Sequence, residues 1–514
     1  MNRKDRRAAG ASASASSPAK LFDQAVRHHA ADRFAQAITL YRAVLAQAPN
    51  EPEVHYNLGM ALAQSGHPDQ AVACWRTALS LRPLYPKASN NLGMTLAELG
   101  QLDEALSCLR FAAALAPEVA EITGNLAAVL RQTGAWDEAE ALLRRTLCLD
   151  PAYADAYNNL GILEADRRRL GPAVTAYRRA LRLAPGHAKA HFNLGLALLT
   201  QGALAEGWAE HEWRFKGGGR HSTPRPFRRP LWQGESLAGR RLLLHAEQGF
   251  GDSLQFLRFA QPLAATGATV LVEVPPALVR LAKTVPGVAQ VVASGDDLPA
   301  FDRHLPMLSL PHLLGVTLTT IPAQTPYLSA DPQAVAMWRQ RLAPCPRPWV
   351  GLVWAGDPRP DDPFANAIDR RRSIGLTVMA PLLALEGVTF VSLQKGAPAA
   401  QTALLAEGQR LLDWTGELTD FADTAALTQA LDLVITVDTA VAHLAGALNR
   451  PVWIASRFDG CWRWLEDRDD SPWYPTARLY RQTAPGPWDQ VVASMAADLA
   501  GLVYPSEAEA SPQA

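Results

Sequence analysis

The N-terminal part of the chain repeats every 34 residues, and this periodicity constrains the fold more than any other feature. The most regular copies contain Asn-Leu-Gly, beginning at Asn57, Asn91, Asn159 and Asn193. The copies also share an alanine followed twelve residues later by a proline: Ala71 and Pro83, Ala105 and Pro117, Ala139 and Pro151, Ala173 and Pro185. Small residues let helices approach closely, and proline cannot occupy a helix interior. The repeat therefore predicts pairs of antiparallel helices.

These positions resemble the tetratricopeptide repeat (TPR) family over residues 18–216, with about six copies. The last copy, HFNLGLALLTQGALAEGWAEHEWRF, keeps the first helix of the pattern and departs from it in the second, which is typical of a capping repeat. The resemblance implies an all-α superhelix that binds a protein or peptide partner on its concave face.

One asparagine recurs at the same place in five copies: Asn57, Asn91, Asn125, Asn159 and Asn193. Equal spacing predicts a ladder of carboxamides along one face of the superhelix. Each amide can both donate and accept hydrogen bonds. The ladder could therefore tie neighbouring repeats together, or it could hold an extended peptide backbone. It resembles the asparagine ladder of the O-linked N-acetylglucosamine transferase family.

The composition excludes several classes of protein. A net charge of -1 argues against a chain that coats nucleic acid or an anionic membrane. Residues 1–17 are basic and Ala/Ser-rich without an apolar signal segment, and we expect disordered tails at 1–17 and 505–514. No stretch is long enough to span a bilayer. The five cysteines form no C-x-x-C pair, which favours reduced thiols and a cytoplasmic location.

After the repeats the sequence changes character. Residues 217–236 are rich in Gly, Pro and Arg and predict a linker. Apolar runs then alternate with helical segments, which predicts parallel sheets in two Rossmann-like lobes, 237–330 and 346–504, joined by a helix within 331–345. The expected strands are RLLLHA, ATVLVEV, QVVAS, WVGLVWAG, VTFVSLQKG and DLVITVD. Such a pair of lobes predicts an enzyme whose cleft lies between the strand C-terminal ends.

Two of the strand-end loops carry candidate binding residues. In HAEQGFGDSLQ, two glycines predict a tight turn after the strand, and Asp252 either caps the next helix or takes part in catalysis. Lys395 follows another strand and is either solvated or a point charge for a phosphate. Arg372 and Ser373, in the run DRRRSIGL, are further candidates for the same ligand.

A third loop lies in DLVITVDTAVAHLAGALNRPVWI, where a strand ends at Asp438-Thr439 and a small-residue helix follows. Helix N-termini present free N–H groups and the positive end of a dipole. We expect a diphosphate on the amides of Thr439, Ala440 and Val441, with Asp438 facing a sugar or ribose hydroxyl. His443 is either a packed core histidine or a ligand contact.

Asp438-Thr439-Ala440, His443-Leu444-Ala445 and Pro451 resemble the D-T-G-x-x-H-L-A-A-A-L-x-x-P motif of the heptosyltransferase (family nine) glycosyltransferases, and the G-D at Asp252 resembles that family's G-D. The resemblance covers about residues 240–500. It implies a GT-B fold, a nucleotide-sugar co-substrate bound mainly by the second lobe, a metal-free inverting transfer without a further cofactor, Asp252 as base and Lys395 on the phosphates. Ala440 departs from the motif glycine and crowds the phosphate approach.

The sequence thus predicts a TPR–glycosyltransferase fusion acting on a protein acceptor. The alternative is a TPR scaffold whose GT-B domain has lost catalysis, and an incomplete Gly-rich fingerprint disfavours a dehydrogenase. His245 is the alternative base. Arg303, His304 and His312 either line an acceptor site or are polar loop residues. The Asp467–Asp469 D-x-D predicts a loop cluster rather than a metal site.

Overall fold

The structure, a computed structural model, describes residues 17–216, 224–405 and 410–503. The expected tails therefore lie outside the described residues except for Ser17, as does the part of the expected linker at 217–223. The chain divides into two compact units, Met1–Leu163 and Glu164–Ala514. The division falls inside a repeat helix.

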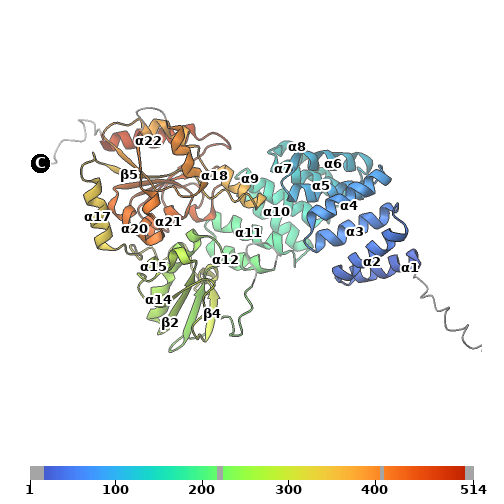
Figure 1. Cartoon of the computed structure of the whole chain (residues 1–514), viewed down its shortest axis with the longest axis horizontal. Coiled ribbons are helices and arrows are strands. Elements are labelled where there is room, and N and C mark those ends of the chain that lie inside the picture. Colours follow the sequence, from blue (N-terminus) through green and yellow to red (C-terminus); the bar gives the residue numbers. More distant parts are fainter. Residues whose placement is uncertain (1–16, 217–223, 406–409, 504–514) are drawn as a thin grey trace, which may run out of the picture. The chain divides into compact units, whose positions relative to one another are not determined.

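The first unit consists of helix pairs that follow the 34-residue period (Figure 1). Its helices are α1 (Pro18–Ala30), α2 (Phe34–Gln47), α3 (Pro52–Gln64), α4 (Pro68–Leu81), α5 (Pro86–Glu98), α6 (Leu102–Leu115), α7 (Ala120–Gln132), α8 (Trp136–Leu149) and the first residues of α9 (Ala154–Asp166). Ala71, Ala105 and Ala139 are fully buried between the helices of a pair. A side chain on Gly93 would meet Leu109 at 2.7 Å, so the glycine permits the close contact of α5 with α6. The predicted all-α repeat array is confirmed.

The second unit begins with the last repeats, α10 (Leu170–Leu183), α11 (Ala188–Thr200) and α12 (Leu204–His211), followed by the 3-10 turn η1 (Glu212–Phe215). Trp208 of α12 is buried, with its ring against those of Phe256 and Trp462. One apolar core contains Leu199, Leu204 and Trp208 together with residues of both sheets. The last repeat is therefore continuous in packing with the α/β part of the chain.

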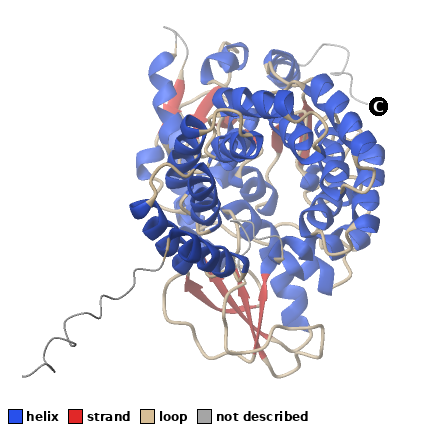
Figure 2. Cartoon of the chain, turned by 90° about the vertical axis from the view of Figure 1, so that its right-hand side faces the viewer, coloured by secondary structure: helices blue, strands red, loops and turns tan. Residues whose placement is uncertain are grey.

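The first sheet has four parallel strands in the order β3-β2-β1-β4. Figure 2 shows its strands in red at the bottom of the view. Its strands are β1 (Arg241–His245), β2 (Thr269–Val274), β3 (Val288–Ala293) and β4 (Arg303–Pro306). The helices around it are α13 (Phe250–Phe256), α14 (Ala260–Ala265), α15 (Val279–Ala282) and α16 (Leu310–Leu313). Arg303 and His304, for which the sequence left open an acceptor site or a polar loop, lie in the strand β4, which pairs with β1. A four-residue strand is too short for alternation to reveal it.

The second sheet has six parallel strands in the order β10-β9-β8-β5-β6-β7. Its strands are β5 (Trp349–Val353), β6 (Thr389–Ser392), β7 (Leu411–Asp413), β8 (Leu433–Val437), β9 (Val452–Ser456) and β10 (Ala477–Arg481). Its helices are α18 (Pro363–Arg372), α19 (Ala380–Leu383), α20 (Phe421–Ala430), α21 (Ala440–Ala447) and α22 (Asp489–Val503), and α17 (Pro332–Leu342) connects the two lobes as expected. The α/β class predicted for this part of the chain is confirmed.

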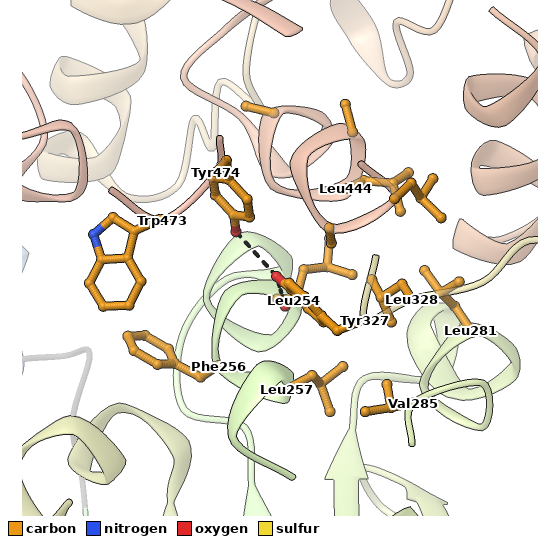
Figure 3. Close-up of a cluster of buried hydrophobic side chains, with 14 of the residues drawn as sticks. Leu254, Phe256, Leu257, Leu281, Val285, Tyr327, Leu328, Leu444, Trp473 and Tyr474 are labelled. Atoms are coloured by element: carbon orange, nitrogen blue, oxygen red, sulfur yellow. Dashed lines mark hydrogen bonds between the residues drawn. The ribbon is translucent and has the colours of Figure 1, made fainter. Parts of the chain in front are cut away.

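The two lobes share an apolar core where α13 meets α21 (Figure 3). Tyr327 donates its hydroxyl to the carbonyl of Leu254 at 3.0 Å, and its oxygen lies 3.4 Å from the hydroxyl of Tyr474. Leu444 of α21 belongs to the same cluster. The lobes therefore contact each other through packed side chains at this point. None of the described helices has the length and apolarity needed to cross a bilayer.

Candidate functional site

The turn between β8 and α21 lies where the strand order of the second sheet reverses. From β5 the chain adds β6 and β7 on one side, and then β8, β9 and β10 on the other. Open parallel sheets bind ligands outside the strand C-terminal ends at such a reversal. Asp438 and Thr439 follow β8 there, and Thr439 is the N-cap residue of α21 in an extended conformation. Its hydroxyl lies 3.0 Å from that of Thr436.

Arg372 and Ser373 lie beside the same reversal, on the β5 side. The Arg372 guanidinium donates to the backbone carbonyl of Asp438 at 3.2 Å and to the carboxylate of Asp369 at 2.9 Å. The Ser373 hydroxyl accepts the N–H of Gly356, which follows β5, at 3.0 Å. A side chain on Gly356 would overlap the Asp369 carboxylate and the Arg372 guanidinium, so it would displace the ion pair between them. The structure thus brings Arg372 and Ser373 together with Asp438.

Lys395 lies after β6 and contacts a different segment. Its ammonium donates to the carbonyls of Thr415 at 2.7 Å and Leu418 at 2.8 Å, which belong to the 3-10 turn η7 (Thr415–Glu417) and the residue after it. The preceding Gln394 accepts from the backbone N–H groups of Trp354 and Ala355. Lys395 therefore holds η7 against the β6 loop in this structure, and its contact with a phosphate stays a prediction.

The glycines near Asp252 do not form the expected tight turn. Gly249 is the N-cap of α13 with φ of -74°, and Gly251 lies within the helix. A side chain on Gly251 would meet Cδ2 of His443 at 2.8 Å and Cα of Ala440 at 3.6 Å. The glycine is thus explained by the close approach of α13 to α21, a tertiary contact that local sequence patterns do not contain.

Asp252 lies in the first turn of α13 rather than before it. Its Oδ2 accepts the N–H of Gly249 at 2.9 Å, so the carboxylate caps its own helix. Its Oδ1 accepts a hydrogen bond from Arg463 of the second lobe. Both carboxylate oxygens are engaged, and the side chains of Asp252 and Arg463 are each only 13% exposed.

Arg463 is the residue of this site that sequence reasoning missed. It lies in the 3-10 turn η8 (Trp462–Trp464) after β9. Besides Asp252, it donates to the side-chain oxygen of Gln255 at 2.9 Å and to Sγ of Cys461 at 3.0 Å. Burial lowers the pKa of the guanidinium, but the neighbouring Asp252 more than compensates, and the pKa is raised overall. In the sequence, Arg463 could have been recognised as a candidate from its position between two tryptophans, shortly after the apolar run VWIAS.

His443 is enclosed by aromatic side chains. Its Nδ1 lies 3.0 Å from the hydroxyl of Tyr474, and its ring stacks on that of Trp464 with centroids 5.3 Å apart. Burial, followed by the charges of Arg463 and Arg258, holds its pKa well below the ordinary value. At neutral pH the imidazole is therefore uncharged and acts in the packing of α21.

The first lobe holds a pair of neighbouring histidines, His245 and His304. His245, the last residue of β1, has Nε2 3.4 Å from Nδ1 of His304, and the ring of Phe227 packs against both. Burial lowers the pKa of His245 to about 3, with Arg225 and His304 adding to the shift. So weakly basic an imidazole is a poor general base at neutral pH. His312 is an exposed residue of α16.

The acidic loop around Asp467 takes part in ion pairs. Asp467 accepts from Arg168 at 3.4 Å, and Arg468 pairs with Asp470. Over residues 17–216, 224–405 and 410–503 the structure contains no group of three or more His, Cys, Asp or Glu side chains placed to hold a metal ion.

The asparagine column makes hydrogen bonds between repeats at two of its positions. The Asn91 amide donates to the hydroxyl of Tyr56 at 3.3 Å, in the repeat before it. The Asn125 amide donates to the side-chain oxygen of Asn90 at 3.1 Å, again one repeat back. Asn57 differs, because its amide donates to the carbonyl of Glu53 in its own helix at 2.7 Å. These contacts link neighbouring repeats. Asn159 lies in α9 and is half-buried, and Asn193, in α11, belongs to the second unit.

The fold and the site together define a helical repeat array followed by a two-lobed α/β region with its loops gathered at a strand-order reversal. Comparison with protein families agrees with both parts. Residues 28–90, 85–152, 137–186 and 158–207 match the tetratricopeptide repeat, and residues 385–454 match "Glycosyltransferase family 9 (heptosyltransferase)". The chain therefore contains tetratricopeptide repeats and a segment of the family 9 glycosyltransferase type. That segment includes Lys395, Asp438, Thr439 and His443, and does not include Asp252 or Arg463.

Among curated proteins, the chain is 29% identical over 328 residues to Protein FlbA of Caulobacter vibrioides, a match that covers 59% of this chain and 53% of that protein. The chain thus spans about half the length of the curated relative it matches. Among solved structures, it is similar to a thermophilic TPR protein of Thermus thermophilus, with 26% identity, a TM-score of 0.32 and coverage of 36% of this chain and 100% of that chain. It is also similar to MamA from Desulfovibrio magneticus, with 24% identity, a TM-score of 0.30 and coverage of 33% and 96%.

Proposed function

We propose that the protein is a glycosyltransferase of GT-B architecture that moves a sugar from a nucleoside-diphosphate donor to a protein held by its repeats. The observation that carries this proposal is the place of the family 9 segment in the fold. It runs from just before β6 into β9 and contains the Asp438-Thr439 turn at the strand-order reversal. A ligand is expected at such a turn in an open parallel sheet.

The charges around the start of α21 suit a diphosphate. The N-terminal N–H groups of α21 carry the positive end of its dipole. Two buried guanidinium groups belong to residues packed around this helix: Arg463 precedes Trp464, whose ring stacks on His443, and Arg258 lies over the ring of Tyr474, whose hydroxyl is bonded to His443. Arg258 is bonded to neutral oxygens, including the Trp473 carbonyl at 2.8 Å and the Tyr327 hydroxyl at 3.1 Å. It also lies over the rings of Tyr327, Trp473 and Tyr474, so it adds positive potential from within a closed aromatic cluster rather than as a direct phosphate ligand.

The transfer itself is a single displacement with inversion. The acceptor hydroxyl oxygen attacks the anomeric carbon, the bond from that carbon to the diphosphate oxygen breaks, and the nucleoside diphosphate leaves with the bonding electrons. The hydroxyl proton passes to Asp252, a step that is worth typically about 10²–10⁴-fold in rate. The amides of α21 and basic side chains stabilise the departing charge in place of a metal ion. Turnover is accordingly expected to persist in EDTA.

The repeats supply the acceptor. In this proposal the concave face of the array binds the protein substrate, and the asparagine column contributes where its amides are not already used between repeats. A non-catalytic scaffold is the alternative, and one observation favours it: both oxygens of Asp252 are engaged, by Gly249 and Arg463.

The proposal is tested by titrating UDP, GDP and ADP into the purified chain, by calorimetry and by thermal melting. A nucleotide that binds only the folded state should stabilise it by about 2.7 kcal/mol at 100 times Kd. Arg372→Gln should weaken binding about tenfold or more, because it removes a charged donor at the Asp438 turn.

The matched control is Arg371→Gln, on the same helix. Arg371 pairs with Asp459 at 3.3 Å and is half exposed, so its replacement should leave nucleotide affinity within about twofold. The proposal fails if none of the three nucleotides binds, or if the two arginine variants bind equally well.

A further inference from the structure

Arg463 interacts with two residues that have different roles in the proposed reaction, Asp252 and Asp438. Its Nη2 is hydrogen-bonded to Asp252, the base of the first lobe. Gly251, next to Asp252, lies where α13 approaches the start of α21, since its added Cβ would lie 3.6 Å from Cα of Ala440. The charge of Asp438, in the turn proposed to bind the diphosphate, also acts on the guanidinium. The guanidinium therefore lies within electrostatic reach of both the expected base and the expected leaving group.

The Asp252–Arg463 pair would oppose catalysis if it persisted. A carboxylate that accepts a charged hydrogen bond on Oδ1 and a backbone N–H on Oδ2 has both oxygens engaged, and taking up the acceptor proton would give up the negative charge that pairs with Arg463. Simple loss of the pair would also be unfavourable, because it would leave a buried guanidinium without its carboxylate. Another anion must replace Asp252 if the carboxylate is to be released.

A donor diphosphate is such an anion. Its oxygens accept two parallel N–H bonds from one guanidinium and form stronger hydrogen bonds than neutral acceptors do. Asp252 would keep its place during the exchange, since the Gly249 N–H still holds Oδ2 at 2.9 Å and only Oδ1 changes partner. The released oxygen is thus already positioned in the first turn of α13.

We propose that Arg463 is a positioning residue that passes from Asp252 to the donor diphosphate, so that Asp252 becomes free to accept a proton only when the donor is bound. This inference rests on the proposed glycosyl transfer. It gives the pairing of Asp252 with Arg463 a role in the reaction, and it requires the donor to bind before the acceptor reacts.

The exchange can be measured without turnover, through the affinity of the nucleoside diphosphate that binds the wild-type chain. If Asp252 competes with the ligand for Arg463, Asp252→Asn should bind the nucleotide about tenfold more tightly, and Arg463→Gln should bind it about tenfold more weakly. In the double variant, the gain in nucleotide affinity from Asp252→Asn should shrink to about twofold or less, because Arg463, for which Asp252 and the nucleotide compete, has been replaced.

The matched control is another ion pair between the lobes. Arg280 of α15 donates to Asp420 at 3.0 Å and to Asp423 at 3.1 Å, at the start of α20. Arg280→Gln removes a link between the same two lobes but leaves the hydrogen bonds of Asp252 and Arg463 in place, so nucleotide affinity should not change.

The outcomes separate the two proposals. If the wild-type chain binds none of UDP, GDP and ADP, the proposed function and this inference both fall. If it binds one of them, but Asp252→Asn and Arg463→Gln change only the melting temperature, the pair is structural and this inference alone is overturned. Should Arg463→Gln fail to fold, Arg463→Lys retains the charge without the planar fork, and an affinity equal to wild type would count against the exchange.

Discussion

Replacing Gly251 by alanine tests how tightly the two lobes are packed at the site. The added Cβ would lie 2.8 Å from Cδ2 of His443, whereas ordinary contacts begin at 3.4 Å. His443 cannot easily retreat, because its ring stacks on Trp464 and its Nδ1 is bonded to the hydroxyl of Tyr474. The overlap must therefore be relieved by moving α13 away from α21 or by disturbing an aromatic cluster.

The expected cost follows from two opposing effects. Overpacking a close-packed core costs about 1–3 kcal/mol. Alanine in place of glycine within a helix recovers about 0.5–1 kcal/mol. Gly251→Ala should therefore lower the free energy of unfolding by about 0–2.5 kcal/mol net, with a central value of about 1 kcal/mol, which denaturant unfolding of the whole chain can measure.

Gly501→Ala is the control, since Gly501 is an exposed helical residue of α22 whose added Cβ would meet nothing within 4 Å. That variant should be neutral or slightly more stable. A second check is Gly251→Ala combined with His443→Ala, which should be no less stable than His443→Ala alone, because the space that the methyl needs has been opened. The reasoning is refuted if Gly251→Ala stabilises the protein as much as Gly501→Ala does.

Two further predictions concern stability. Because the pKa of His245 falls to about 3 in the folded chain, the unfolded chain takes up a proton that the native chain does not as pH falls below about 6.5. The unfolding free energy should then drop by about 1.4 kcal/mol per pH unit from this residue, and His245→Asn should flatten the curve between about pH 6.5 and about pH 4; an unchanged slope would contradict this. In the repeats, Asn91→Ala should destabilise the array by about 0.5–1.5 kcal/mol in thermal melts followed by circular dichroism, because a bond between repeats is lost. Asn57→Ala, which loses only a bond within its own helix, should cost less, and equal losses would argue against a linking role for Asn91.

Sequence periodicity was sufficient for those parts of the fold that depend on neighbouring residues. The 34-residue repeat predicted the helix pairs, and apolar runs located β1, β2, β3, β5, β6 and β8 and the connecting helix α17. Burial on one face of a helix, or on both faces of a parallel strand, leaves a pattern that can be read along the chain. The edge strands β7 and β10 and the short β4 leave a weaker pattern, and they were missed. The interior strand β9 was also missed, although its residues VWIAS are all buried.

Residue types and strand-end positions also indicated Asp252, Arg372, Ser373, Asp438 and Thr439 as candidates for one site. A helix N-terminus that follows a strand can be recognised from neighbouring residues, and so can an aspartate that stabilises the first turn of a helix. What these residues contact depends on distant segments, as the hydrogen bonds of Lys395 to the η7 turn show.

Only the tertiary structure decided which groups face each other across the lobes. Asp252 and Arg463 are 211 residues apart in the chain, and no spacing rule relates them. Gly251 is explained by His443, and His443 by Tyr474, again across long separations. The physical reason is that hydrogen bonds and steric fit depend on distances of a few ångströms in space, which folding establishes between segments whose own sequences specify only their local conformation.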